Sequence, residues 1–329
     1  MKNDKYTTKG IVEAGIMTGI VVILMLIAAY IPMFGIGGIL LLPVPITIIY
    51  LRHGFKEALL SIIVSDIIVS TAYDPILTLS LAILYGSTAL TLGYCIKRKL
   101  KFGKIIMILT LVNIVAMIAN VLLVSIITSN GIGGLSDQMQ VLINNFKGSI
   151  EKTKAMGINS GLGEESLARY DEMISVLNVD YMLKLMAGAI TIYALISAYI
   201  NYIICRKILG RLGYEVEKET PVSMINFDAK IGLVVILFVL IGTILTYYKI
   251  PAGEYFYNSS NYVLQTIFVI QGISVIVYFL RNKFNIHKGI IIAMLILLFS
   301  IISQIAIFIG LGDLIFDFRK INKNRVNRK

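Results

Sequence analysis

Long apolar stretches alternate with short charged clusters along the whole chain. Most stretches reach about 20 residues, the length that a helix needs to cross about 30 Å of hydrocarbon. There are nine of them, at 11–33, 36–51, 56–73, 76–96, 104–128, 181–205, 229–248, 261–280 and 288–309. Backbone groups in lipid must be satisfied within a segment, and the alternation of a membrane β-barrel is absent. The pattern therefore predicts an all-α, polytopic membrane helical bundle.

Composition excludes an ordinary soluble domain. Of the 329 residues, 57% are hydrophobic and 15% are charged, against about 45–50% and about 25% in soluble domains. The net charge of +11 does not indicate nucleic acid. Its basic residues cluster between apolar segments, where they set topology and contact anionic lipid headgroups. We expect the lipid bilayer as a partner and no nucleic acid.

The distribution of lysine and arginine predicts the orientation. Basic residues precede the first segment and follow the second, fourth and sixth, whereas loops 34–37 and 74–75 have none. By the positive-inside rule, we expect the N-terminus in the cytoplasm of a bacterial plasma membrane. If all nine segments crossed, the tail from position 319 onward would lie outside. That tail has six basic residues, which the rule places inside. Either one segment does not cross, the proline-broken second one being the weakest, or the final stretch turns back near Gly310 and Gly312.

The longest polar region is 129–180, which is predicted to lie outside. It holds seven acidic and four basic residues. Two amphipathic patterns, over 135–150 and 167–177, flank a glycine-rich turn signal at 157–163. We expect a helical hairpin, which either lies on the membrane as a connector or caps a cavity.

Signatures of catalysis are absent from the sequence. There is no glycine-rich phosphate loop with a lysine, no His-Glu-x-x-His, no Cys-x-x-Cys and no Gly-x-Ser-x-Gly. His53 and His287 stand beside basic residues at segment boundaries and suit headgroup contact. The lone Cys95 and Cys205 make neither a disulfide framework nor a metal site. We therefore expect that the protein is not an enzyme and that it binds neither a cofactor nor a metal.

Polar residues inside apolar segments are the candidates for ligand binding. Asp66 should face the bundle interior or water, either in a substrate or proton site or as a structural hydrogen-bonding group. Asn113 and Asn120 share a helix face and either line the same cavity or join two helices. Tyr73 and Asp74 form the outer turn that follows Asp66. These five residues are the candidate ligand-binding set.

Small residues recur at a spacing of four in the first segment. Ala14 pairs with Thr18 in this way, and Gly15 pairs with Gly19. Such pairs let another helix approach closely. The surface is predicted to pack against a helix of the same chain or to bind another membrane protein.

Four stretches carry a resemblance to a known family: Thr8–Gly15, Leu42–Pro45, Leu51–Gly54 and Gly310–Lys320. The most specific part is the C-terminal pattern Gly-x-x-Asp-x-x-x-Asp-x-Arg. Together they resemble the YybS-like family of uncharacterised multi-pass membrane proteins from Gram-positive bacteria, and the resemblance covers the whole chain. The family brings no activity and no catalytic residues to this sequence.

A more distant resemblance concerns residues 1–210. Their layout is similar to the substrate-binding (S) components of energy-coupling-factor transporters, whose first helix docks onto a transmembrane coupling subunit through a small-xxx-small motif. The long loop at 129–180 and three further segments depart from that layout. The resemblance implies an S-component-like six-helix membrane bundle over 1–210, with the outer hairpin, followed by C-terminal helices and a basic tail over 211–329.

Two functions are compatible with these observations. In the first, the bundle binds or transports a small molecule in a cavity that opens outward between 34–38, Tyr73–Pro75 and the hairpin. In the second, the protein is a membrane scaffold or assembly factor that binds partner proteins and transports nothing. Retention of a small ligand by the purified protein would favour the first.

Overall fold

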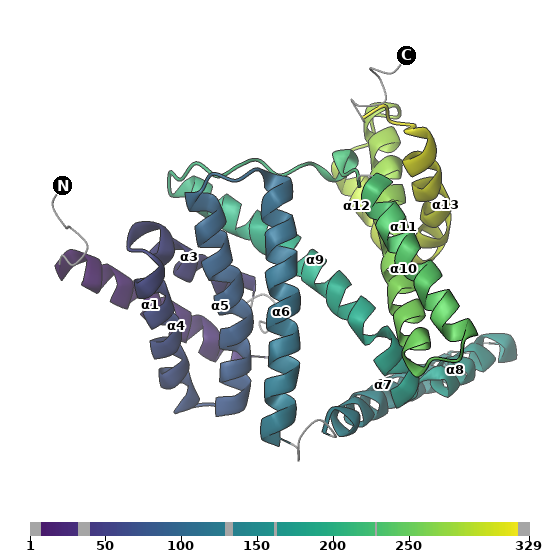
Figure 1. Cartoon of the computed structure of the whole chain (residues 1–329), viewed down its shortest axis with the longest axis horizontal. Helices are drawn as coiled ribbons and strands as arrows, with labels where there is room; N and C mark the ends of the chain where they lie inside the picture. The colour runs from purple at the N-terminus through teal and green to yellow at the C-terminus, as the bar shows by residue number, and fades with distance from the viewer. Residues whose placement is uncertain (1–7, 32–39, 129–133, 161–162, 228, 322–329) are drawn as a thin grey trace. The chain divides into compact units, whose positions relative to one another are not determined.

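The computed structural model describes residues 8–31, 40–128, 134–160, 163–227 and 229–321 (Figure 1). Within these ranges the chain is helical and forms no strand. The helices are α1 (Thr8–Tyr30), α3 (Pro43–Arg52), α4 (Phe55–Ser70), α5 (Pro75–Lys97), α6 (Phe102–Thr128), α7 (Gly134–Asn159), α8 (Glu164–Val176), α9 (Val179–Arg211), the short 3-10 helix η2 (Val222–Met224), α10 (Ala229–Tyr247), α11 (Pro251–Asn282), α12 (Lys288–Leu297) and α13 (Phe299–Phe316).

Six of the described helices, α1, α5, α6, α9, α10 and α11, are long and apolar enough to cross a membrane. The other apolar helices are shorter than the about 20 residues that a crossing needs. Among them, α3 has 10 residues and α4 has 16. The polytopic all-α fold predicted from the sequence is confirmed.

The chain divides into two compact units. Unit 1 comprises residues 1–146 and 193–219, and unit 2 comprises 147–192 and 220–329. Helices α7 and α9 therefore contribute to both units. The domain division between 210 and 211 stays a prediction.

The short helix α3 is buried in unit 1. All its residues from Pro43 to Tyr50 are buried, and α1, α4 and α5 pack against it. Pro43 and Pro45 stand in its first turn, where backbone N–H groups have no helical acceptor, so the prolines cost no hydrogen bond. These prolines made the second apolar segment the weakest candidate for a membrane crossing. In the structure they stand at the start of a buried helix.

Two apolar clusters hold unit 1 together. One joins α1, α3, α4 and α5 around Met25 and Ile46, and neither side chain is exposed. The other joins α3, α5 and α6 to the second half of α9 around Tyr202. The Tyr202 hydroxyl donates to the Glu217 carbonyl at 2.6 Å, which ties the segment after α9 to the same bundle.

Unit 2 is built around α11, which packs against both α10 and α13 (Figure 1). Glycines allow these close contacts. A Cβ at Gly242 of α10 would lie 2.7 Å from the Tyr257 backbone. A Cβ at Gly310 of α13 would overlap the Phe268 carbonyl, and one at Gly272 of α11 would overlap the Ala306 carbonyl.

The ninth apolar segment is two helices, which meet at Leu298. Helix α12 follows α11, and the second half of α11 is bonded through Ser274 to the Val222 and Ile225 carbonyls, just before α10. Arg319, three residues beyond α13, donates to the Ser223 carbonyl at 3.0 Å, just before α10. The final stretch therefore returns to the side from which it starts. The reversal lies at Leu298, not near Gly310 and Gly312 as the sequence suggested.

The polar region between α6 and α9 contains the two expected amphipathic helices, α7 and α8. An ion pair joins Lys154 to Asp171 at 2.5 Å. Helix α7 continues to Asn159, so the turn predicted at 157–163 begins later than expected. Residues 161–162 of that turn lie outside the described ones.

Candidate functional site

The polar residues that were predicted to line one cavity do not bond to one another. Asp66 is on α4, and its Oδ1 is buried without a hydrogen-bond partner among the described residues. Asn113 Oδ1 accepts from Thr88 at 2.9 Å, and Asn120 Nδ2 donates to the Ser80 carbonyl at 3.1 Å. Both asparagines on α6 thus bond to α5 and do not contact Asp66. This geometry favours a helix-joining role for them.

Tyr73 and Asp74 shape the turn between α4 and α5. Asp74 is the N-cap of α5 and accepts from the backbone N–H groups of Ile76 at 2.8 Å and Leu77 at 3.0 Å. The Tyr73 ring packs edge-on against Tyr30 of α1, with centroids 5.7 Å apart. The predicted outward cavity at this turn includes residues 34–38, which lie outside the described ones, and it stays a prediction.

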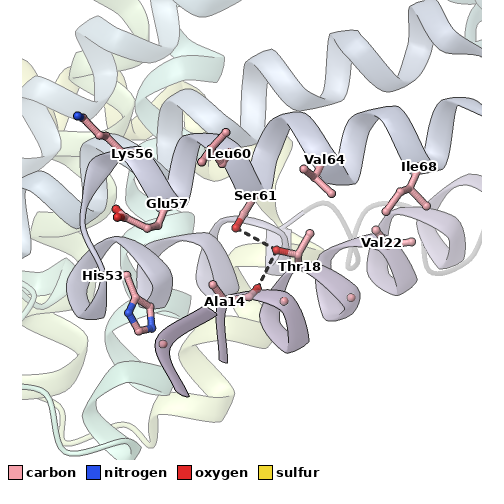
Figure 2. Close-up of a pocket in the computed structure, with 13 residues that line it drawn as sticks. Ala14, Thr18, Val22, His53, Lys56, Glu57, Leu60, Ser61, Val64 and Ile68 are labelled. Atoms are coloured by element: carbon pink, nitrogen blue, oxygen red, sulfur yellow. Dashed lines mark hydrogen bonds between the residues drawn. The ribbon is translucent and has the colours of Figure 1, made fainter. Parts of the chain in front are cut away.

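A hollow lies between α1 and α4 in unit 1. This α1–α4 groove has a volume of about 640 Å³. Its floor is a polar contact between the two helices, shown in Figure 2: the Thr18 and Ser61 hydroxyls lie 2.9 Å apart, and Thr18 also donates to the Ala14 carbonyl at 2.8 Å. Both hydroxyl side chains are buried.

The small residues of α1 fall into two sets around this groove. Ala14 packs on the apolar cluster of unit 1, and Thr18 bonds to α4. Gly15 and Gly19 line the groove, and a Cβ built on either would meet no described atom within 4 Å. At these two glycines no described helix makes the close approach that their spacing suggested, and the space beside them is open.

Along α4 the groove is apolar at one end and polar at the other. Leu60, Val64 and Ile68, spaced four residues apart on one face, line the apolar part (Figure 2). His53, Lys56 and Glu57 line the other end. This α4 face was not predicted from the sequence. Positions 56, 60, 64 and 68 repeat at the helical spacing, but apolar residues within an apolar segment give no sign of a groove.

The turn between α3 and α4 gathers these polar groups. Gly54 has a φ of 115°, and α4 begins at the next residue. This positive φ favours glycine, which has no Cβ. His53 Nε2 lies 3.2 Å from Glu13 Oε2, and Arg52 forms an ion pair with the same carboxylate. Among the described residues, Lys56 and Glu57 form no ion pair. The polar end of the groove thus offers one unpaired cation beside one unpaired anion.

A second polar cluster lies inside unit 2, and it explains the C-terminal sequence pattern. Arg319 and Asp313 form an ion pair at 2.8 Å whose side chains are each 1% exposed. Gln271 of α11 donates to Asp313 at 2.7 Å, and Ser274 lies 2.5 Å from Arg319. Gly310 permits the close contact with α11, and Asp313 and Arg319 of the pattern Gly-x-x-Asp-x-x-x-Asp-x-Arg bond to α11 and to the segment before α10.

Ser274 extends this cluster to the segment before α10. Its hydroxyl lies 2.6 Å from the Val222 carbonyl and 2.8 Å from the Ile225 carbonyl. These bonds and those of Arg319 are internal to unit 2. Gln271, Ser274, Asp313 and Arg319 are all buried, so the cluster is inaccessible to a ligand. Its role is to join segments of unit 2.

No group of three potential metal-ligating side chains occurs among the described residues. The expectation that the protein is not an enzyme stays a prediction.

Comparison with known proteins bears out the resemblance seen in the sequence. The model of a family described as "Predicted membrane protein (DUF2232)" matches residues 19–314. The uncharacterized protein YybS of Bacillus subtilis (strain 168) is 22% identical over 323 residues, covering 95% of this chain and 98% of that protein. No solved structure matches the chain. The similarity to transporter S components therefore stays a prediction.

Proposed function

The chain belongs to the predicted membrane protein family DUF2232, and we propose that this member binds an amphipathic small molecule in its α1–α4 groove. The observation that carries the proposal is the open space beside Gly15 and Gly19. A groove of about 640 Å³ lies within the range of about 300–1,000 Å³ that small-molecule sites occupy. Its apolar length and polar end suit a ligand with a hydrophobic body and a polar head.

Filling the groove tests the proposal. Gly15→Leu and Gly19→Leu extend a side chain into the open space. A Cβ built at either position meets no described atom within 4 Å, so we expect the fold to tolerate both substitutions. We expect mass spectrometry of compounds released from gently purified protein to find an amphipathic molecule with the wild type and to find it depleted at least tenfold with either variant.

Gly103→Leu is the matched control. Gly103 is also a helical glycine with no described atom within 4 Å of a built Cβ, but it lies on α6, away from the groove. This variant should retain the ligand like the wild type. Equal ligand content in all four proteins would contradict the proposal. If a protein co-purifies with the wild type and is lost from Gly15→Leu in place of a small molecule, the scaffold function is supported instead.

A further inference from the structure

We infer that the α1–α4 groove holds a phospholipid with a zwitterionic headgroup, whose phosphate meets Lys56 and whose ammonium meets Glu57. This inference rests on the proposed function and names the class of its ligand. The lipid's acyl chain would lie along Leu60, Val64 and Ile68, which line the apolar part.

The length of the groove favours a lipid over a membrane-spanning helix. From Lys56 to Ile68 the helix α4 rises about 18 Å at about 1.5 Å per residue. One leaflet contributes about 15 Å, half of the hydrocarbon thickness of about 30 Å. The apolar part, from Leu60 to Ile68, covers about 12 Å of this rise and therefore fits within one leaflet. A membrane-spanning helix would need an apolar surface of about 30 Å.

The charges at the polar end favour a headgroup that carries both a negative and a positive charge. Lys56 and Glu57 are adjacent in the first turn of α4, and neither is in an ion pair among the described residues. The neighbouring cation Arg52 is already paired with Glu13. An anionic headgroup would satisfy Lys56 and leave its negative charge beside Glu57. A headgroup with a phosphate and an ammonium complements both side chains.

The apolar face beside the groove is accessible from the bilayer. Leu60 is 60% exposed, Val64 44% and Ile68 46%, in a chain with six described helices long and apolar enough to cross a membrane. A lipid can therefore enter sideways from its leaflet. No opening through the bundle interior is required.

Native mass spectrometry of the full chain tests the inference. The protein is titrated with dioleoyl phosphatidylethanolamine or dioleoyl phosphatidylglycerol, which share acyl chains and differ in headgroup charge. We expect the wild type to bind one ethanolamine lipid more tightly than the glycerol lipid. Lys56→Gln should weaken binding of the ethanolamine lipid about fivefold, the effect of one cation near lipid phosphate. Glu57→Gln should abolish the preference between the two lipids.

Lys104→Gln is the matched control, because Lys104 is also an exposed lysine in the first turn of a helix, α6. It should bind both lipids like the wild type. Equal or tighter binding of phosphatidylglycerol by the wild type would overturn the inference, as would a Lys56→Gln variant that behaves like Lys104→Gln. If a different amphiphile is released from the wild type and lost from Gly15→Leu, the inference fails while the proposed function stands.

Discussion

The Arg319 guanidinium is a buried charge, and each of its three nitrogens donates a hydrogen bond. Its removal would leave the Asp313 carboxylate buried and without its cation. Breaking a buried ion pair from one side costs about 3–5 kcal/mol. We therefore expect Arg319→Leu to lower the thermal unfolding temperature of the purified protein strongly.

Replacing both partners is the control for that prediction. A doubly apolar pair leaves no orphan charge, so Asp313→Leu combined with Arg319→Leu should recover much of the stability lost by Arg319→Leu alone. If the double variant is as unstable as the sum of the two single ones, the pairing does not account for the effect.

Asp66 calls for a different prediction, because its Oδ1 has no partner among the described residues and it does not line the α1–α4 groove. A neutral amide is less costly to bury than a carboxylate. We expect Asp66→Asn to raise the thermal unfolding temperature and to leave retention of the groove ligand unchanged. Loss of ligand with an intact fold would instead make Asp66 a binding residue.

The sequence showed which polar residues lie within apolar segments, but it did not determine their partners. Asn113 and Asn120 share a helix face as predicted, and both meet α5, because α5 packs directly on α6. The spacing of two residues along a helix predicts whether they share a face. Their hydrogen-bond partners depend on which helix packs against that face, and the spacing does not reveal this. The groove was missed for the same reason, since part of its lining comes from apolar residues of α4, which carry no polar signal in the sequence.

At the scale of helices, Gly310 decides how closely α13 can approach α11. A Cβ there would overlap the Phe268 carbonyl, which is backbone and cannot turn aside. We expect Gly310→Ala to destabilise the protein by about 1–3 kcal/mol, the usual cost of overpacking, as measured by chemical or thermal unfolding in detergent.

Gly232→Ala serves as the reference for Gly310→Ala. Gly232 lies in α10, and its built Cβ would meet only Leu314 Cδ1, at 3.9 Å. Alanine at this helical position should be neutral or slightly stabilising. Similar unfolding midpoints for the two variants would show that the α11–α13 contact is looser than described.

The sequence predicted the presence of the long helices, but not the residues at which helices begin and end. The long apolar segments correspond to α1, α5, α6, α9, α10 and α11, because length and apolarity decide whether a segment can cross. The reversal at Leu298 was invisible, because an apolar residue carries no turn signal. Pro43 and Pro45 did mark a boundary, but a buried ten-residue helix cannot be told from a weak span by hydropathy.

At the scale of the molecule, α12 and α13 bring Arg319 back beside Ser223, just before α10. The positive-inside rule expects this return if the segment before α10 is cytoplasmic. We expect Lys218→Cys and Lys320→Cys to be protected from an impermeant thiol reagent in intact cells. Ser136→Cys and Ser166→Cys should be labelled. All four positions are exposed, and the native Cys95 and Cys205 are buried, so background labelling should be low.

Two results of that labelling would contradict the account. Labelling of Lys320→Cys with protection of Lys218→Cys would mean that α12 and α13 cross the membrane once. Labelling of Lys218→Cys with protection of Ser136→Cys would reverse the orientation.

The central claim is that the α1–α4 groove is a ligand site, and an experimental structure of the full chain in a phospholipid nanodisc tests it most directly. It should show elongated non-protein density between α1 and α4, running from Lys56 to Ile68 beside Gly15 and Gly19. Density that ends in a headgroup at Lys56 and Glu57 is the predicted result. A groove closed by repacked side chains, or filled by a helix of another protein, would contradict the claim.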